Sequence, residues 1–130
     1  MDIRGLMRRA VSFNSDREAV VHGDRRLTFD QSWRRGLRLA NALLDMGLKP
    51  GDRVGSLEDN GIPAVDFFVA AAAANLVRVP LYPRNSAETH AHMLGHTGCR
   101  AVIASAEYVG ELDGLLEQLP NLERIITRDD

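Results

Sequence analysis

The stretch that decides the fold is Arg53-Val-Gly-Ser-Leu57, followed by the apolar segment 62–75 and by Val77-Arg-Val-Pro-Leu81. Two short apolar runs on either side of a helix-length segment are typical of a strand, a crossover helix and a parallel strand. The same alternation continues, with strands predicted at 101–104 and 124–127 and helices at 87–96 and 106–119. The sequence therefore predicts an α/β fold with a parallel sheet of about four strands and flanking helices.

The residues before this sheet have a different pattern. A short amphipathic helix is expected over 3–13. Gly23-Asp24 is a two-residue turn with glycine first, and it joins strands expected at 18–22 and 25–29. Turns of this kind connect antiparallel strands, so a β-hairpin is predicted.

A second N-terminal helix is expected to begin after Thr28, which has capping-box spacing to Gln31, and to end at Gly47. Its apolar positions recur every three to four residues, at Trp33, Leu37, Ala40, Leu43 and Leu44. The opposite face is charged, and we interpret it as a solvated face rather than an anion-binding patch. That face carries Arg34, Arg35, Arg38 and Asp45.

Composition limits the classes of protein to consider. The chain has 130 residues, 45% apolar and 26% charged, which is typical of one globular domain, and a formal net charge of -2, which argues against a nucleic-acid partner. A single cysteine, Cys99, excludes an internal disulfide and favours a reducing compartment, so a cytoplasmic location is expected. The charged N-terminus does not resemble a signal peptide, and no apolar stretch reaches the roughly 20 residues that cross a bilayer.

The helix predicted over 62–75 is apolar around most of its circumference, because Asp66 is its only charged residue. Such a helix needs cover on two sides, and a domain of this size has few elements to supply it. We therefore expect that a neighbouring structural half completes this region.

Several residues have side chains that can bind metals or anions, and we interpret them as structural. His92 and His96, with Glu88, have the spacing of zinc ligands on one helix face, but no further ligand completes a site, and His90 points elsewhere. We interpret these histidines as surface residues and Cys99 as a small core residue. Helix starts at Asn60 and Ser86 are interpreted as caps rather than anion sites. The chain lacks a nucleophile elbow, a dinucleotide fingerprint and a phosphate-binding P-loop.

An ordered series of segments carries a family resemblance. In sequence order they are Leu27-Thr28-Phe29 with the Trp33 helix, Gly47-Leu48-Lys49-Pro50-Gly51-Asp52-Arg53-Val54, Ala73-Ala74-Asn75-Leu76-Val77-Arg78-Val79-Pro80-Leu81-Tyr82-Pro83-Arg84, Ser86-Ala87-Glu88, and Thr97-Gly98-Cys99-Arg100-Ala101-Val102-Ile103. Together they resemble the N-terminal region of the adenylate-forming, AMP-binding superfamily, and the Val-Pro-Leu-x-Pro-Arg form is most similar to fatty-acyl- or aryl-CoA ligases. Two segments depart from the family pattern: Asn75-Leu76 replaces Gly-Ala, and Glu58-Asp59-Asn60-Gly61 replaces Pro-Asn-Ser.

The resemblance implies that residues 1–130 form an N-terminal subdomain of a larger ligase, with 1–52 as helix, hairpin and helix and 53–130 as parallel βα units. The implied parent enzyme is a long- or medium-chain fatty-acid–CoA ligase that uses ATP, Mg²⁺ and CoA. None of the family's catalytic motifs lies in this chain, and Lys49, its only lysine, matches neither family lysine. We therefore assign no catalytic, cofactor-binding or metal-ligating residue and expect the chain alone to be an inactive scaffold.

The implied partners are the remainder of the ligase chain and a fatty acid or other carboxylate. Peripheral association of the parent enzyme with a membrane is compatible with such a substrate. Two other interpretations stay open. One is a stand-alone module that binds a partner protein or itself through the apolar helix over 62–76. The other is a flavodoxin-like domain that binds a flavin or nucleotide.

Overall fold

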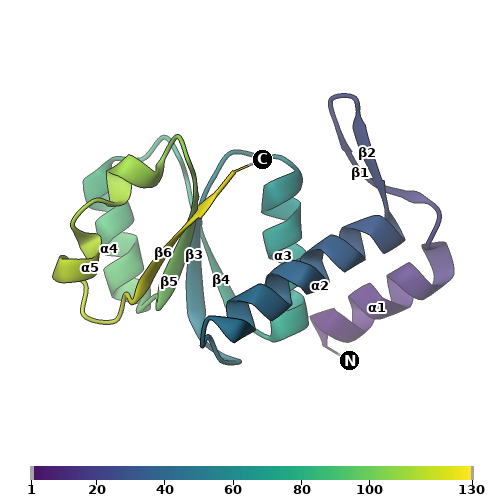
Figure 1. Cartoon of the computed structure of the whole chain (residues 1–130), viewed down its shortest axis with the longest axis horizontal. Coiled ribbons are helices and arrows are strands. Elements are labelled where there is room, and N and C mark those ends of the chain that lie inside the picture. The colour runs from purple at the N-terminus through teal and green to yellow at the C-terminus, as the bar shows by residue number, and fades with distance from the viewer. Residues whose placement is uncertain (1, 130) are drawn as a thin grey trace. The chain divides into compact units, whose positions relative to one another are not determined.

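In a computed structural model that describes residues 2–129, the chain divides into two compact units (Figure 1). Unit 1 consists of the residues up to Pro50 together with Asn60–Leu76. Unit 2 consists of Gly51–Asp59 together with the residues from Val77 onward. The segment 60–76 therefore makes its contacts with the N-terminal residues, although in sequence it lies between two strands of the sheet.

Unit 1 contains three helices and one hairpin. Its elements are α1 (Ile3–Asn14), β1 (Glu18–His22), β2 (Arg25–Thr28), α2 (Phe29–Asp45) and α3 (Ile62–Ala74). β1 pairs antiparallel with β2, and Gly23 in the turn has a φ of 59°, which favours glycine. The predicted N-terminal helix and hairpin are confirmed.

The start of α2 is fixed by the predicted capping box. Thr28 Oγ1 accepts the backbone N–H of Gln31 at 3.1 Å, and the Gln31 side chain accepts the backbone N–H of Thr28 at 2.9 Å. Both bonds satisfy donors that a helix leaves unpaired at its N-terminus. After Asp45 the chain turns at Gly47, whose φ of 96° is left-handed, so the predicted end of the helix is also confirmed.

α2 and α3 approach each other closely at Gly36. A Cβ atom added to Gly36 would lie 2.3 Å from Val69 Cγ1 and 2.6 Å from Val69 Cβ, so only glycine fits at this contact. α2 thus covers one face of the apolar helix α3, whose buried residues include Phe67 and Ala70. Within residues 2–129, no helix is both long enough and apolar enough to span a membrane.

Unit 2 is built on a four-stranded parallel sheet, as predicted, and the strand order is β4-β3-β5-β6. The strands are β3 (Arg53–Leu57), β4 (Val77–Leu81), β5 (Ala101–Ser105) and β6 (Arg124–Arg128). The other elements are α4 (Ala87–Thr97), the 3₁₀ helix η1 (Val109–Leu112) and α5 (Leu115–Gln118). The α/β fold class, with a four-stranded parallel sheet after a helix and a hairpin, is confirmed.

The core of unit 2 is one apolar cluster drawn from its strands and helices. Its buried members are Leu57, Val79, Leu81, Leu94, Cys99, Val102, Ala104, Leu112, Leu115 and Leu122. Cys99 is 1% exposed, which confirms its interpretation as a core residue, and burial raises the pKa of its thiol. The core therefore leaves this thiol protonated and poorly reactive.

Two local predictions were wrong. Residues 106–119 do not form one helix but η1 and the short α5, because Gly114 adopts a left-handed φ of 77° between them. Asn60 does not cap α3, since the N-cap is Gly61 and no side chain accepts a hydrogen bond there. The cap at Ser86 is confirmed, because its Oγ accepts the Thr89 N–H at 3.2 Å.

Candidate functional site

The carboxyl edge of the sheet in unit 2 is the first candidate for a functional site. In open α/β sheets, ligands bind outside the carboxyl ends of the strands at the point where the strand order reverses. The chain passes from β3 to β4 on one side and returns to β5 on the other side of β3, so this point lies between the ends of β3 and β5. Glu58 and Asp59 follow β3, while Ser105 ends β5 and Tyr108 comes shortly after it.

These edge residues are held by polar contacts within unit 2. The Tyr108 hydroxyl donates a hydrogen bond to Asp59 Oδ2 at 3.0 Å, and this bond, followed by burial, raises the pKa of Tyr108. Arg128 Nη1 lies 3.8 Å from Glu58 Oε2. Ser105 Oγ is buried and has no hydrogen-bond partner among the described residues. The edge can offer hydrogen bonds and carboxylates, but it brings together no nucleophile with a base.

Sequence reasoning did not single out these edge residues as a site. Glu58 and Asp59 entered only as a departure from the family pattern. The usable signal was the pair of predicted strand ends at 57 and 104, because parallel strands end at the same edge.

The histidines of α4 do not converge on a metal. His90, expected at the surface, is instead fully buried: Nε2 lies 2.8 Å from the Tyr82 carbonyl oxygen, and Nδ1 lies 3.2 Å from Glu111 Oε2. His90 thus connects α4 to the residue after β4 and to Glu111 of η1. His92 and His96 are exposed and stack with their ring centroids 5.7 Å apart. Among residues 2–129, no group of three His, Cys, Asp or Glu side chains is placed to hold a metal.

Arg35 is not part of a solvated face, contrary to the prediction. Its Nε donates to Asp66 Oδ1 at 3.0 Å and its Nη2 donates to Asp66 Oδ2 at 2.7 Å, a two-bond contact between α2 and α3. The Asp66 side chain is only 4% exposed. The charge on the otherwise apolar α3 is therefore neutralised within unit 1. Arg34 and Arg38 are exposed, as expected.

The segments that carry the family resemblance have structural roles here. Asp52, from the turn that leads into β3, accepts a hydrogen bond from Arg100 Nη1, and Arg100 Nη2 donates to Glu123 at 2.8 Å. The Arg100 guanidinium lowers the pKa of Glu123, and the hydrogen bonds that Arg100 donates to Glu123 and Asp52 raise the pKa of Arg100. Lys49 is exposed in the turn before β3.

The structure accounts for the departure at Asn75. This residue caps the C-terminus of α3 with a φ of 56° and a ψ of 39°, which is the left-handed region. Glycine adopts that conformation without strain, and asparagine is the next most tolerant residue. Asparagine can therefore replace the family's glycine here with the backbone conformation preserved.

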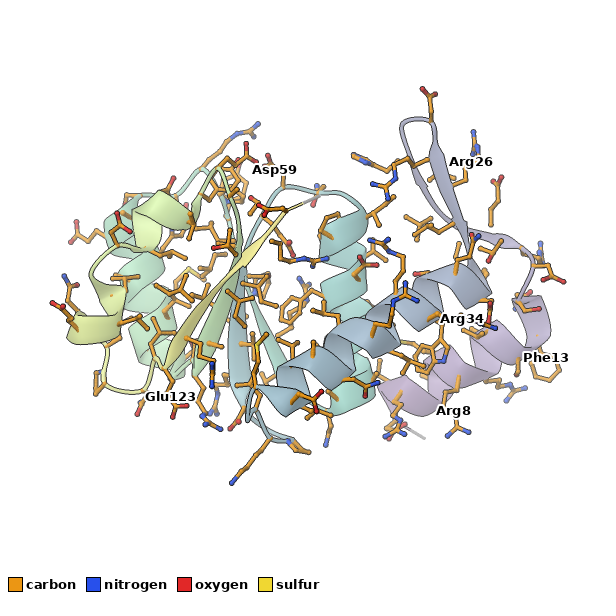
Figure 2. All side chains as sticks on the ribbon, in the orientation of Figure 1. Arg8, Phe13, Arg26, Arg34, Asp59 and Glu123 are labelled. Carbon is orange, nitrogen blue, oxygen red and sulfur yellow. The ribbon has the colours of Figure 1, made fainter. Side chains whose placement is uncertain are left out.

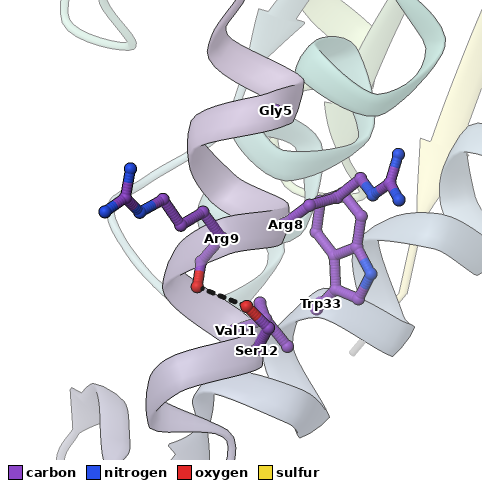
Figure 3. A pocket seen from close by; sticks show the side chains of 6 residues that line it. All are labelled: Gly5, Arg8, Arg9, Val11, Ser12 and Trp33. Carbon is purple, nitrogen blue, oxygen red and sulfur yellow. Dashed lines mark hydrogen bonds between the residues drawn. The ribbon is translucent and has the colours of Figure 1, made fainter. Parts of the chain in front are cut away.

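Several hollows lie beside α1 in unit 1, and one of them is lined by Ile3 and Leu6 together with Ala71 and Leu76 of the α3 region. An apolar cavity of about 180 Å³ is bounded by α1, β1, α2 and α3, and Ser32 and Trp33 supply its only polar atoms from side chains. A shallower groove runs along α1, where Arg8 lies beside Trp33 and Arg9 extends on the other side of the helix (Figure 3). Ser12 Oγ in this groove donates to the Arg9 carbonyl oxygen at 2.8 Å.

Comparison with known proteins identifies the family. The model of the AMP-binding enzyme family matches residues 7–130. The chain is 34% identical over 107 residues to malpibaldin synthetase of Mortierella alpina, covering 82% of this chain and 2% of that protein. It is 32% identical over 120 residues to feruloyl-CoA synthase of an Amycolatopsis species, covering 80% of this chain and 24% of that protein.

A solved structure gives the same result. The fatty acyl CoA synthetase of Mycobacterium tuberculosis matches with a TM-score of 0.91 and 26% identity, over 98% of this chain and 26% of that chain. The chain thus spans about a quarter or less of the length of these relatives. The predicted resemblance to the N-terminal region of adenylate-forming ligases is confirmed, and the chain belongs to the AMP-binding enzyme family.

Proposed function

We propose that this chain is the N-terminal part of a ligase that activates a carboxylic acid with ATP. In the first step a carboxylate oxygen attacks the α-phosphorus of ATP, which gives an acyl-adenylate and releases pyrophosphate. In the second step the thiol of CoA attacks the acyl carbon, which gives the thioester and releases AMP and a proton. The observation that carries the proposal is the family match over residues 7–130.

We further propose that the chain alone is an inactive scaffold, a single N-terminal subdomain over residues 1–130. Phosphoryl chemistry needs cationic groups or metal placed against the developing charge. Lys49 lies in an exposed turn, and Arg35 and Arg100 hold carboxylates of the fold. ATP, Mg²⁺ and CoA would therefore be held by the remainder of the ligase chain, which is the expected partner.

For the whole protein we propose a medium- or long-chain fatty acid as substrate and a cytoplasmic location, with peripheral membrane contact. Fatty acyl CoA synthetase is the name of one structural relative, whereas feruloyl-CoA synthase is the name of a sequence relative. Palmitate, octanoate and ferulate are therefore the three acids to compare.

Pyrophosphate exchange into ATP tests the proposal. The 130-residue chain and a protein extended through the rest of its reading frame are each incubated with ATP, Mg²⁺, labelled pyrophosphate and one of the three acids. We expect exchange only with the extended protein, and fastest with a fatty acid. Exchange by the 130-residue chain would overturn its inactivity, and an extended protein that activates none of the acids would overturn the ligase assignment.

The stand-alone interaction module through 62–76 stays an alternative prediction. Phe68, 49% exposed, is the large apolar side chain that α3 offers to a partner. Light scattering with a Phe68→Ser variant tests it: a wild-type oligomer that the variant converts to a monomer would favour the module.

A further inference from the structure

The exposed side of α4 carries two histidines that are one helical turn apart. His92 and His96 stand at positions i and i+4, and residues with this spacing are neighbours on the surface of a helix. Both residues are exposed, and their rings lie within 15° of parallel with their centroids 5.7 Å apart. His90 does not belong to this pair, because it is buried against Tyr82 and Glu111. The pair therefore offers two imidazoles side by side to the solvent.

The helix that carries the pair is fixed at both of its ends. At the N-terminus, Ser86 Oγ accepts the N–H of Thr89 at 3.2 Å. At the C-terminus, Gly98 adopts a left-handed φ of 68°, and its N–H is hydrogen-bonded to carbonyl oxygens of the last turn. Leu94, which lies between the two histidines in sequence, is 1% exposed and belongs to the core of unit 2. The backbone therefore positions both histidines before any ligand binds, which lowers the entropy cost of binding.

The charges of α4 favour a cation at this pair. The helix contains Glu88, one turn before His92, and its sequence has no lysine or arginine. His96 lies in the last turn, where the backbone carbonyl groups of a helix leave a partial negative charge. A positive ion between the two rings is therefore attracted by the C-terminal end of α4 and by Glu88, and no cationic side chain of Lys or Arg on the same helix opposes it.

We propose that His92 and His96 together bind a divalent transition-metal ion through one ring nitrogen each, with Cu²⁺ bound most tightly. Imidazole is a ligand for Cu²⁺, Ni²⁺ and Zn²⁺, and the affinity of a given site is highest for Cu²⁺. Cu²⁺ accepts a tetragonal set of nitrogen and oxygen ligands, so water oxygens complete its coordination. The two exposed rings turn toward one ion by changes of side-chain rotamer, which leave the core undisturbed. This site goes beyond the proposed ligase activity and does not depend on it.

Other metal-ligating side chains of unit 2 are held within the fold. Cys99 is buried in the core, which removes its sulfur from solution. Asp59 accepts a hydrogen bond from Tyr108, and Glu123 accepts one from Arg100. Figure 2 shows these two carboxylates at opposite ends of the sheet, so they do not form a joint site. The pair on α4 is therefore the site of unit 2 where two exposed nitrogen ligands lie together among the described residues.

Isothermal titration calorimetry of the 130-residue chain, without an affinity tag, tests the proposal with Cu²⁺, Ni²⁺, Zn²⁺ and Mg²⁺. We expect one Cu²⁺ site that depends on the pair, weaker binding of Ni²⁺ and Zn²⁺, and no binding of Mg²⁺, which prefers oxygen ligands. His92→Asn and His96→Asn should each lower the Cu²⁺ affinity about tenfold or more, because one of the two imidazole ligands is lost. Cu²⁺ should also raise the thermal midpoint of the wild type, since the pair is positioned only in the folded helix.

Two further variants separate binding by the pair from binding by any exposed histidine. His22→Asn removes an exposed histidine of β1 and should leave the Cu²⁺ affinity unchanged. Glu88→His added to His96→Asn creates an i,i+4 pair one turn earlier on α4 and should recover most of the lost affinity. Circular dichroism of each variant checks that it folds.

Three results would overturn the proposal. The first is an unchanged Cu²⁺ affinity in both His92→Asn and His96→Asn. The second is a loss in His22→Asn as large as the loss in these two variants. The third is a double variant, with Glu88→His and His96→Asn, that binds Cu²⁺ no better than His96→Asn alone, since the spacing of the histidines would then not matter.

Discussion

The two units are stabilised in different ways. Unit 1 combines buried apolar residues of α2 and α3 with two specific contacts between these helices, the Arg35–Asp66 pair and the close approach at Gly36. Unit 2 depends on a parallel sheet and a continuous cluster of ten buried residues. A distributed apolar core tolerates apolar changes that conserve volume, whereas removal of one partner from a buried ion pair leaves an uncompensated charge. Substitutions at the two specific contacts of unit 1 should therefore have larger effects than substitutions at the surface pair Arg100–Glu123 of unit 2.

The largest expected effect is that of Arg35→Leu. This change leaves the Asp66 carboxylate buried without its guanidinium, and we expect a loss of about 3 kcal/mol in the free energy of unfolding. Arg34→Leu on the same helix is the control. Its side chain is 70% exposed and pairs with Asp30 on the surface, so its loss should be about 0.5 kcal/mol or less. Urea denaturation followed by circular dichroism measures both, and equal losses would contradict the role of the buried pair.

The second prediction compares the loss of stability when a methyl group is added at a tightly packed glycine in each unit, by Gly36→Ala in unit 1 and Gly55→Ala in unit 2. At Gly36 the new methyl group meets the branched Cβ of Val69, and we expect a loss of about 2 kcal/mol. At Gly55 its nearest neighbour is Leu94 Cδ2 at 2.6 Å, the end of a flexible side chain, so the loss should be about 1 kcal/mol. Adding Val69→Ala to Gly36→Ala should restore part of the stability. If Val69→Ala only adds to the loss, the steric explanation is wrong.

Asn75 offers a smaller effect at the end of α3. Asn75→Gly should leave the thermal midpoint nearly unchanged, whereas Asn75→Ala should cost about 1 kcal/mol, because alanine is strained in the left-handed conformation. Thermal denaturation of the two variants decides the matter. An alanine variant as stable as the glycine variant would contradict the conformational argument.

The smallest effect concerns the surface pair Arg100–Glu123 of unit 2. Arg100 lowers the pKa of Glu123 below its ordinary value of 4.5, so the pair stabilises the fold above that pH and its contribution is lost as the pH falls through the lowered pKa. Arg100→Gln should therefore be less stable than the wild type at neutral pH, and the difference should shrink in acid and in high salt. Denaturation curves at several pH values measure it, and a difference that grows in acid would contradict the assignment.

Much of the fold could be predicted from the sequence because its signals are local. The capping box at Thr28, the glycine in the hairpin turn and the short apolar strands each act over a few residues, and all were predicted. The break at Gly114 was missed because the leucines of residues 106–119 have helical spacing. The left-handed conformation of Gly114 nevertheless separates η1 from α5.

The contacts that depend on the tertiary fold were not predictable. Arg35 lies on the charged face of its helix, and its partner Asp66 is 31 residues away in sequence. His90 lies on the same helix as the exposed His92 and His96, but in the fold its two ring nitrogens contact Tyr82 and Glu111. The candidate edge of the sheet required the strand order, which periodicity alone does not supply. Only the family resemblance carried information about function.

The junction between β2 and α2 has a consequence for protein engineering. Thr28 is both the last residue of the strand and the N-cap of the helix, so the two elements have no linker between them. An insertion after Thr28 would separate its hydroxyl from the Gln31 N–H and change the direction in which the hairpin leaves the helix. An insertion between Gly23 and Asp24 would only lengthen an exposed turn. The hairpin tip is therefore the place to attach a fluorophore or a fusion partner. Because no linker separates β2 from α2, the hairpin would hold that probe in a defined direction relative to α2.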